Sequence, residues 1–318
     1  MPFTVAVPTS PTLPVPESPD NDVLKFTCRD YDGNTVDHSL TIILPGSKAF
    51  LYIDEKSTTF EYQTDTKKLS DKAHAKGYVL YDYGVKSGVF VMHSIPNYGV
   101  KNIGTLPKNA DTNSQHIMCV SIDEDALHVI GEYIFIIEPA LWRPKIPEFV
   151  QNHFLKKIKN DEFEDKKESA KPLQFKSFTR TGFTLFVKNT PTQVWDQLIE
   201  AYPENFFYVI NWKCNINTKK LQQVVRTKAE FENYVEEWDA GLDHAKLAIT
   251  RGEPPEAIVC VSDLNHAESQ AKRAGGMLCV EQQDWLKGFR HHFKYTTKDE
   301  KEAEEKKQNR TKPKRNLQ

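Results

Sequence analysis

The fold is indicated most clearly by the stretch His74-Ala75-Lys76-Gly77-Tyr78-Val79-Leu80-Tyr81, which has a partner in His244-Ala245-Lys246-Leu247-Ala248-Ile249-Thr250. Each stretch opens with the same tripeptide and continues into residues typical of a β-strand. A turn and a second strand-like run follow in both cases. The second run leads to a polar side chain, which is His93 in the first copy and Asn265 in the second. This internal repeat predicts one active site built from two similar halves.

The His-x-Lys tripeptide alone is a weak signal, because a chain with 10 histidines contains such a tripeptide by chance. A third copy, His292-Phe293-Lys294, stands beside a charged tail and no strand follows it. We therefore treat it as a chance match. The shared strand-turn-strand context distinguishes the other two copies.

The composition is typical of a soluble globular protein with a large core, since 318 residues include 39% hydrophobic and 27% charged side chains. No apolar run is long enough for a transmembrane helix. The net charge of -2 exerts no strong general attraction on nucleic acid. Protonation of the histidines would make the chain positive, so a polyanion should bind better in mild acid.

The chain is predicted to belong to the α/β (α+β) class and to divide into five segments. Two of these segments are folded halves, each with a mixed β-sheet flanked by helices. The segments are a disordered N-terminal extension (1–22) with no signal-peptide pattern, an N-terminal half (23–150), a charged linker (151–173), a C-terminal half (174–296) and a charged, disordered tail (297–318). For the basic end of the tail, a solubilising role is favoured over contact with nucleic acid.

Local patterns predict the main elements within the halves. Strands are expected at 39–44, 49–53, 116–122, 134–137 and 206–212. Helices are expected at 192–201, 229–238 and 282–293, the last of these being the final helix of the chain.

The five cysteines contain no Cys-x-x-Cys pair, so a structural zinc site is not indicated. Two bridges are conceivable, Cys260 with Cys279 and Cys28 with Cys119, which leaves Cys214 over. Reduced, buried thiols are the alternative.

The paired histidines and lysines suit phosphodiester chemistry. Residues two apart on a strand point to the same face, so His74 would project with Lys76, and His244 with Lys246. Ammonium groups can hold the non-bridging oxygens of a phosphodiester, one imidazole can attack phosphorus, and the other can protonate the leaving oxygen. No metal or other cofactor is required in this scheme. The nearby cations should lower both histidine pKa values, which favours an acidic optimum.

Several longer motifs carry a resemblance to a known family. His74-Ala75-Lys76-Gly77 with His93-Ser94-Ile95-Pro96-Asn97-Tyr98 is similar to HTKG…HSVPNF, and 115–121 to GQTLLCVS. Further on, 243–246, 260–265 and 273–279 resemble DHSK, CVGDMN and RGGGTLC. These motifs are those of the deoxyribonuclease II family, one of the phospholipase D-like phosphodiesterases.

The resemblance implies roles for individual residues. His74 with Lys76 and His244 with Lys246 would be the catalytic pairs, with His74 as nucleophile and His244 as general acid, or the reverse. His93 would support activity, and Asn265 would orient or polarise the second half-site. The family disulfides correspond to Cys28–Cys119 and Cys260–Cys279.

The resemblance also implies an activity and a setting. The family cuts double-stranded DNA internally, without metal, at acid pH, and leaves 3′-phosphates; it is mostly lysosomal or secreted. DNA would be the substrate, no membrane partner is indicated, and the oligomeric state stays open, a homodimer included. Other open readings are a related phosphodiesterase acting on RNA or phospholipid, and an inactive nucleic-acid-binding relative.

This chain departs from the family in three respects. No signal peptide is visible. Leu247 stands where the family often has a Trp-Cys pair, and the one glycosylation sequon is Asn309-Arg310-Thr311 in the tail.

Overall fold

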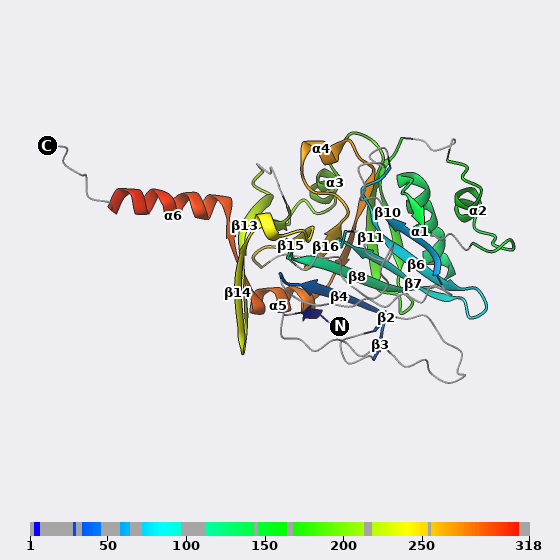
Figure 1. Cartoon of the computed structure of the whole chain (residues 1–318), viewed down its shortest axis with the longest axis horizontal. Coiled ribbons are helices and arrows are strands. Elements are labelled where there is room, and N and C mark those ends of the chain that lie inside the picture. The colour runs from blue at the N-terminus through cyan, green and yellow to red at the C-terminus, as the bar shows by residue number, and fades with distance from the viewer. Residues whose placement is uncertain are drawn as a thin grey trace.

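The described part of the chain forms two large β-sheets with six α-helices, which confirms the predicted mixed α/β class (Figure 1). It is described from a computed structural model. The structure describes residues 3–6, 28–29, 34–45, 58–63, 72–96, 112–142, 146–163, 168–212, 218–253 and 256–311. The strand predicted at 49–53 lies outside these residues.

The first sheet has seven strands, all from the first part of the chain. Their order is β1 (Phe3–Ala6), β4 (His38–Ile43), β8 (Gln115–Ile122), β7 (Ser87–His93), β6 (Lys76–Asp82), β5 (Thr58–Gln63) and β9 (Leu141–Trp142). All neighbours are antiparallel except β1 and β4. A small separate hairpin pairs β2 (Cys28–Arg29) with β3 (Thr35–Val36).

The second sheet has nine strands from the rest of the chain. Their order is β10 (Ala170–Lys176), β11 (Gly182–Lys188), β17 (Gly275–Glu281), β16 (Ile258–Ser262), β15 (Leu247–Thr250), β12 (Phe207–Ile210), β13 (Leu221–Phe231) and β14 (Tyr234–Asp239), with β18 (Phe293–Thr297) also paired to β13. Only β12 and β13 are parallel.

The two sheets share an order of antiparallel pairing. The run β4-β8-β7-β6-β5 in the first sheet has the same connections as β11-β17-β16-β15-β12 in the second. In each run a helix follows the second strand: α1 (Glu124–Ile137) follows β8, and α5 (Gln283–His292) follows β17. The strand that follows each repeated tripeptide, β6 or β15, therefore has the same place in its sheet.

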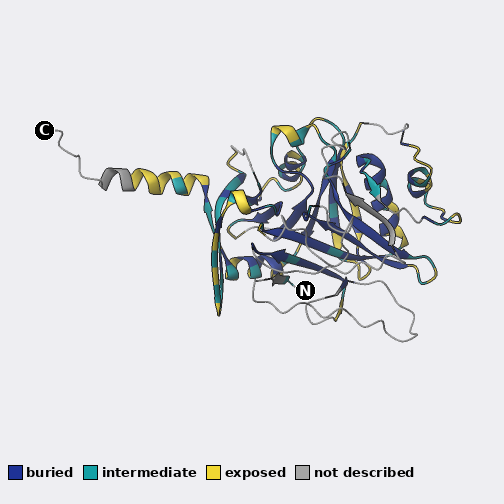
Figure 2. Cartoon of the chain, in the orientation of Figure 1, coloured by how far each residue is buried: buried dark blue, intermediate teal, exposed yellow. Residues whose placement is uncertain are grey.

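One hydrophobic core joins the sheets (Figure 2). Phe90 and Val120 of the first sheet belong to the same buried cluster as Leu185 and Val259 of the second. Helix α1 packs on β10 and β11 as well as on its own sheet. Burial of this apolar surface, worth about 25 cal/mol per Å², favours a fixed relation between the sheets.

Most of the predicted elements occur. The expected strand at 206–212 is β12, and the expected helix at 192–201 is α3 (Val194–Ala201). The strands expected at 39–44 and 116–122 are β4 and β8. The helix expected at 282–293 is α5.

Two predictions of secondary structure are wrong. The segment 229–238 is not a helix but part of the hairpin of β13 and β14, and in β14 exposed residues alternate with more buried ones. The segment 134–137 is not a strand but the last turn of α1. That helix begins upstream, where the Asp123 carboxylate accepts the Ala126 N–H, and the apolar run simply continues its buried face.

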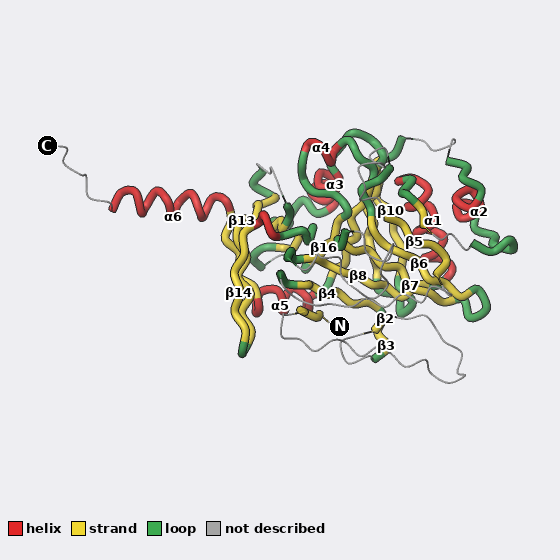
Figure 3. The backbone as a smooth tube through the Cα atoms, in the orientation of Figure 1, coloured by secondary structure: helices red, strands yellow, loops and turns green. Residues whose placement is uncertain are grey.

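The charged and terminal segments contain more structure than predicted. Residues Lys298–Thr311 of the tail form α6, which begins with reciprocal hydrogen bonds between Thr297 and Glu300 and extends away from the body of the molecule (Figure 3). Helix α5 is therefore not the last helix. In the N-terminal extension β1 pairs with β4, and the Phe3 ring lies 4.5 Å from that of Phe289.

The charged linker also holds regular structure. Helix α2 (His153–Lys159) begins at Asn152, whose side chain accepts the Leu155 N–H. The short helix α4 (Glu268–Ala271) and the 3-10 helix η2 (Ala240–Leu242) complete the elements among the described residues.

Candidate active site

The first His-x-Lys segment is attached to the second sheet. The backbone N–H of His74 donates to the Ala274 carbonyl at 3.0 Å, and its Nδ1 lies 2.8 Å from the Asp263 carbonyl oxygen. The backbone N–H of Lys76, the first residue of β6, donates to Asp263 Oδ1 at 3.4 Å. The site is thus held at the entrance to β6 by partners almost 200 positions away in sequence.

The second His-x-Lys segment is attached to the first sheet in a similar manner. The backbone N–H of His244 donates to the Ser114 carbonyl at 3.0 Å, and that of Lys246 donates to His116 Nδ1 at 3.3 Å. Lys246 also directs its ammonium to the His244 carbonyl at 2.9 Å. The sequence pattern predicts that both residues of each pair lie within a strand. In the structure only Lys76 does, as the first residue of β6, whereas His74 precedes β6 and both His244 and Lys246 precede β15.

Each His-x-Lys segment is thus attached to the sheet of the other one, and the charges of both lysines act on both histidines. Burial lowers the pKa of His74 well below its usual value, and the ammonium groups of Lys76 and Lys246 lower it further. Burial, Lys246 and Lys76 lower the pKa of His244 to about 4. The pKa of each histidine is therefore lowered by the lysine of the other segment as well as by the lysine of its own segment.

The surroundings of the two imidazoles differ. His74 has one ring nitrogen engaged with a carbonyl oxygen, which makes that nitrogen the N–H and leaves Nε2 as the nitrogen with a lone pair. Among the residues that the structure describes, no group hydrogen-bonds to the ring of His244, which instead lies against Trp212 with centroids 5.3 Å apart.

His93 and Asn265 are both buried near the pairs. His93 ends β7, and burial together with Lys76 lowers its pKa to about 3. Asn265 follows β16, and its side-chain oxygen finds no hydrogen-bond donor among the described residues. A buried acceptor of this kind is available to a ligand.

Two buried carboxylates were missed by the sequence reading. Asp263 accepts hydrogen bonds from the Tyr133 hydroxyl at 2.5 Å and the Gly276 N–H at 3.0 Å. Asp243, directly before His244, accepts the Trp238 indole N–H at 3.0 Å. Burial raises the pKa of each carboxyl to about 6. The signals for them were their places in the stretches 243–246 and 260–265, which resemble DHSK and CVGDMN.

Lys188 was also missed, although it is completely buried. Its ammonium donates to the carbonyls of Ala271, Arg273 and Thr190 at 2.7, 2.6 and 2.9 Å. Burial lowers its pKa to about 8. Lys188 therefore fixes the loop whose next residue, Ala274, receives the His74 N–H.

Both expected cysteine pairs are disulfides in the structure. Cys28–Cys119 joins β2 to β8, and Cys260–Cys279 joins β16 to β17. Each bridge is attached to a strand that begins beside a tripeptide of the other sheet. Residues at the start of β8 bind the second tripeptide, and Ala274, just before β17, binds the first. Cys214 lies outside the described residues.

The third tripeptide lies elsewhere. His292 ends α5, where its ring stacks on Phe231, and Lys294 forms an ion pair with Glu230. The expectation that no strand follows this tripeptide is wrong, because Phe293 and Lys294 begin β18, which pairs with β13.

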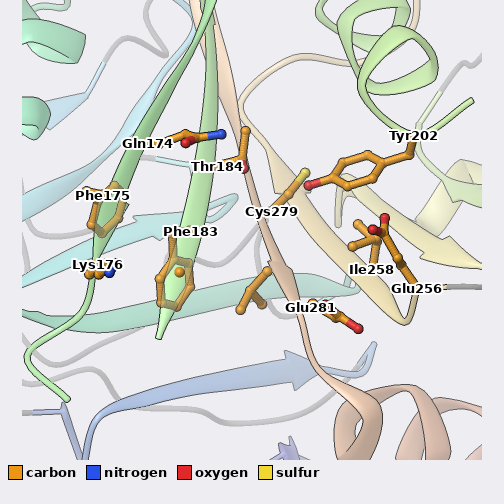
Figure 4. Close-up of a pocket in the computed structure, with 12 residues that line it drawn as sticks. Gln174, Phe175, Lys176, Phe183, Thr184, Tyr202, Glu256, Ile258, Cys279 and Glu281 are labelled. Carbon is orange, nitrogen blue, oxygen red and sulfur yellow. The ribbon is translucent and has the colours of Figure 1, made fainter. Parts of the chain in front are cut away.

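A cavity of about 520 Å³ lies away from the paired tripeptides. It is lined by β10, β11 and β17 together with Tyr202, Glu256 and Ile258 (Figure 4). Within the described ranges, no three His, Cys, Asp or Glu side chains gather as a metal site, and no helix is long and apolar enough to cross a membrane.

Comparison with known proteins places the chain among the nuclease hydrolases. The family model for deoxyribonuclease II matches residues 63–298. The chain belongs to the deoxyribonuclease II family.

The relatives are distant but extensive. Cell death-related nuclease 6 of Caenorhabditis elegans is 25% identical over 73% of this chain and 68% of its own length. Cell-death-related nuclease 7 of the same organism is 26% identical over 73% and 66%. Deoxyribonuclease-2-alpha of Rattus norvegicus is 24% identical over 70% and 66%. The chain thus spans about two thirds of the length of these relatives.

Proposed function

We propose that the protein is an acid endodeoxyribonuclease that cuts DNA without a metal and passes through a phosphohistidine. In this proposal the two sheets are phospholipase D-like halves, related by a pseudo-twofold axis, that share one active site. The observation that carries it is the crossed attachment of the two tripeptides: His74 N–H to Ala274 and His244 N–H to Ser114. Family membership supplies DNA as the substrate class.

His74 suits the role of nucleophile. The carbonyl oxygen of Asp263 holds the Nδ1 proton, so the Nε2 lone pair is available to phosphorus. Its low pKa keeps the ring neutral in mild acid, which a nucleophilic imidazole requires.

His244 suits the role of general acid. It is less buried than His93 and keeps the higher pKa, about 4 against about 3. A bound phosphodiester would offset the charges of Lys246 and Lys76 that depress this pKa, and so favour the imidazolium. The rate should therefore fall as pH rises, because the acid form is lost.

The reaction would run in two displacements. His74 Nε2 forms a bond to phosphorus while the bond from phosphorus to the 5′-oxygen breaks, and His244 gives its proton to that oxygen. Neutral His244 then takes a proton from water, the hydroxide attacks phosphorus, and the phosphorus–nitrogen bond breaks to leave a 3′-phosphate. Lys76 and Lys246 would hold the non-bridging oxygens and offset their charge in both steps.

His93 and Asn265 would have supporting roles. Buried His93 stands beside Lys76, where it would help to fix the ammonium. The unoccupied oxygen of Asn265 would orient a donor on the second half-site, such as the attacking water.

The setting follows the chemistry. An enzyme of this type would act in an acidic compartment, lysosomal or secreted, and the two disulfides are of the kind that persists in such places. Both lysines and both histidines are present, which favours an active enzyme over an inactive nucleic-acid-binding relative.

The test is cleavage of a supercoiled plasmid at about pH 5 with EDTA present. We expect nicking and linearisation by the wild type and none by His74→Ala or His244→Ala. His128→Ala, which changes an exposed histidine of α1, should cut like the wild type. Absence of cutting by the wild type, or full cutting by either catalytic variant, would contradict the proposal. Labelled RNA and phospholipid, assayed in parallel, test the related substrates.

A further inference from the structure

His116 occupies a position that neither tripeptide nor the family motif singles out. It is the second residue of β8, and its side chain is completely buried.

The imidazole of His116 is the acceptor for the second catalytic segment. Nδ1 of His116 receives the backbone N–H of Lys246 at 3.3 Å, across the boundary between the sheets. The counterpart in the other half is Asp263 Oδ1, which receives the backbone N–H of Lys76 at 3.4 Å. Each lysine is thus positioned by one acceptor side chain of the opposite sheet.

The two acceptors respond differently to acid. A carboxylate that takes up a proton retains lone pairs that accept. An imidazole that accepts through Nδ1 must be the neutral Nε2–H tautomer, and protonation at Nδ1 turns the acceptor into a donor. The Lys246 N–H and a protonated His116 would then oppose each other.

The surroundings of His116 strengthen this conflict. The groups that face it are the ammonium groups of Lys246, from the approach to β15, and Lys76, from β6, together with His93 of β7. No carboxylate contributes to its electrostatic environment among the described residues, and its Nε2 is buried with no hydrogen-bond partner there. A second positive charge at this point would be repelled by both lysines.

The backbone of β8 holds the ring at this point. Ser94 Oγ accepts the His116 N–H at 2.9 Å and donates to Gln115 Oε1 at 2.6 Å, and the Ser94 N–H donates to the His116 carbonyl at 3.1 Å. These bonds fix the backbone that carries the ring, and the ring itself is completely buried. We therefore expect protonation to displace the Lys246 segment.

We propose that His116 is a positioning residue for the second half-site, and that its protonation releases Lys246 and His244 and so limits activity on the acid side. The inference rests on the proposed nuclease function. The proposed reaction needs protonated His244 and therefore slows as the pH rises. The inference adds that it also slows at low pH, where His116 becomes protonated. The enzyme would have a bounded window of pH.

The experiment compares His116→Asn with His116→Leu in the full-length chain. The side-chain oxygen of asparagine can stand where Nδ1 stands and does not titrate, whereas leucine has no acceptor. Plasmid cleavage is measured from about pH 3 to pH 7 for both variants and the wild type. The matched control is His291→Asn, which changes an exposed histidine at the end of α5.

The expected result has three parts. His116→Asn keeps near wild-type activity at the optimum and loses the steep fall at low pH. His116→Leu loses roughly 10- to 100-fold in kcat at every pH, because a displaced catalytic group costs this much. The control has the profile of the wild type.

A low-pH fall in His116→Asn identical to that of the wild type would overturn the inference. So would full activity of His116→Leu. Inactivity of the wild type on plasmid would instead refute the nuclease proposal, so the two failures are distinguishable.

Nitrogen NMR of the imidazole in the wild type provides a measurement that needs no variant to fold. We expect an unprotonated Nδ1 and a protonated Nε2 at neutral pH. The opposite tautomer would overturn the inference, because an N–H at Nδ1 cannot accept from Lys246.

Discussion

The two half-sites use the same tripeptide but hold it differently. In the first, the His74 ring is fixed by the Asp263 carbonyl, and a carboxylate receives the lysine N–H. In the second, the His244 ring is half-buried against Trp212, and an imidazole receives the lysine N–H. The fixed tautomer of His74 suits a nucleophile, which needs a lone pair at a defined nitrogen. The ring of His244, which can gain and lose a proton, suits a general acid. In the proposed mechanism, this difference in support assigns different roles to two histidines that are otherwise equivalent.

The most decisive test of which histidine is the nucleophile and which is the general acid uses a substrate whose leaving group needs no proton. His244→Ala should lose about 10²- to 10⁴-fold on DNA, the usual contribution of a general acid, but less than about tenfold in the first turnover of a deoxynucleoside 3′-(4-nitrophenyl phosphate). Later turnovers stay slow, because His244 also activates the water of the second displacement. His74→Ala should be inactive on both substrates because the nucleophile is gone. Release of nitrophenolate and plasmid nicking are measured side by side. If His74→Ala rather than His244→Ala is rescued, the roles are reversed.

The lysines should contribute nearly equally. Lys76→Met and Lys246→Met should each reduce kcat by about 10²- to 10³-fold, since each removes one charge from the transition state. They should also move the pH profile upward, because both ammonium groups depress the pKa of both catalytic histidines. Lys→Arg at the same positions keeps the charge and serves as control. A large loss from one lysine alone would show that a single half-site holds the phosphate.

The disulfides offer a comparison of stability between the sheets. The Cys28–Cys119 bridge closes a sequence separation of 91 and the Cys260–Cys279 bridge one of 19. From chain entropy, replacing both cysteines of the pair by serine should cost about 4–5 kcal/mol for the first bridge and about 3 kcal/mol for the second. Urea unfolding at equilibrium measures both. Equal losses would mean that the bridges do not act through the unfolded chain.

Lys188 allows the first half-site to be disturbed alone. Lys188→Met removes the donor from two carbonyls of the loop before Ala274, those of Ala271 and Arg273, and from the Thr190 carbonyl, at a cost of about 1–3 kcal/mol. NMR should show a shifted His74 resonance and an unchanged His244 resonance. Lys176→Met, at an exposed position of β10, is the matched control. A shift at both histidines would mean that the two attachments are not independent.

The smallest predicted effect, when it is taken per pH unit, is on stability. The unfolded chain protonates His93 near pH 6.5, whereas the folded chain does so only near pH 3. Stability should therefore fall as pH drops through this window, by about 1.4 kcal/mol per pH unit for this one histidine. His93→Gln should reduce the slope of unfolding free energy against pH by that amount. An unchanged slope would show that His93 titrates normally.

Parts of the fold and site followed from local pattern. The repeated tripeptide, the strands β4, β8 and β12 and the two cysteine pairs are features of short stretches or of resemblance. The hairpin of β13 and β14 did not follow, because its acidic residues fit a helix face as well as the outer side of a strand. The long helix α1 was hidden because its last apolar turn has the composition of a strand.

The sequence by itself determined which reactive groups this protein carries and the strands that present them. Only the tertiary structure decided their partners, since His74 meets Ala274, Lys246 meets His116, and Lys188 meets Ala271 through contacts between segments 80 to 200 positions apart. Sequence pattern reports the local preferences of the backbone. The pKa of a buried imidazole is instead set by desolvation and by charges that arrive from elsewhere in the chain, and these exist only after the two sheets have packed.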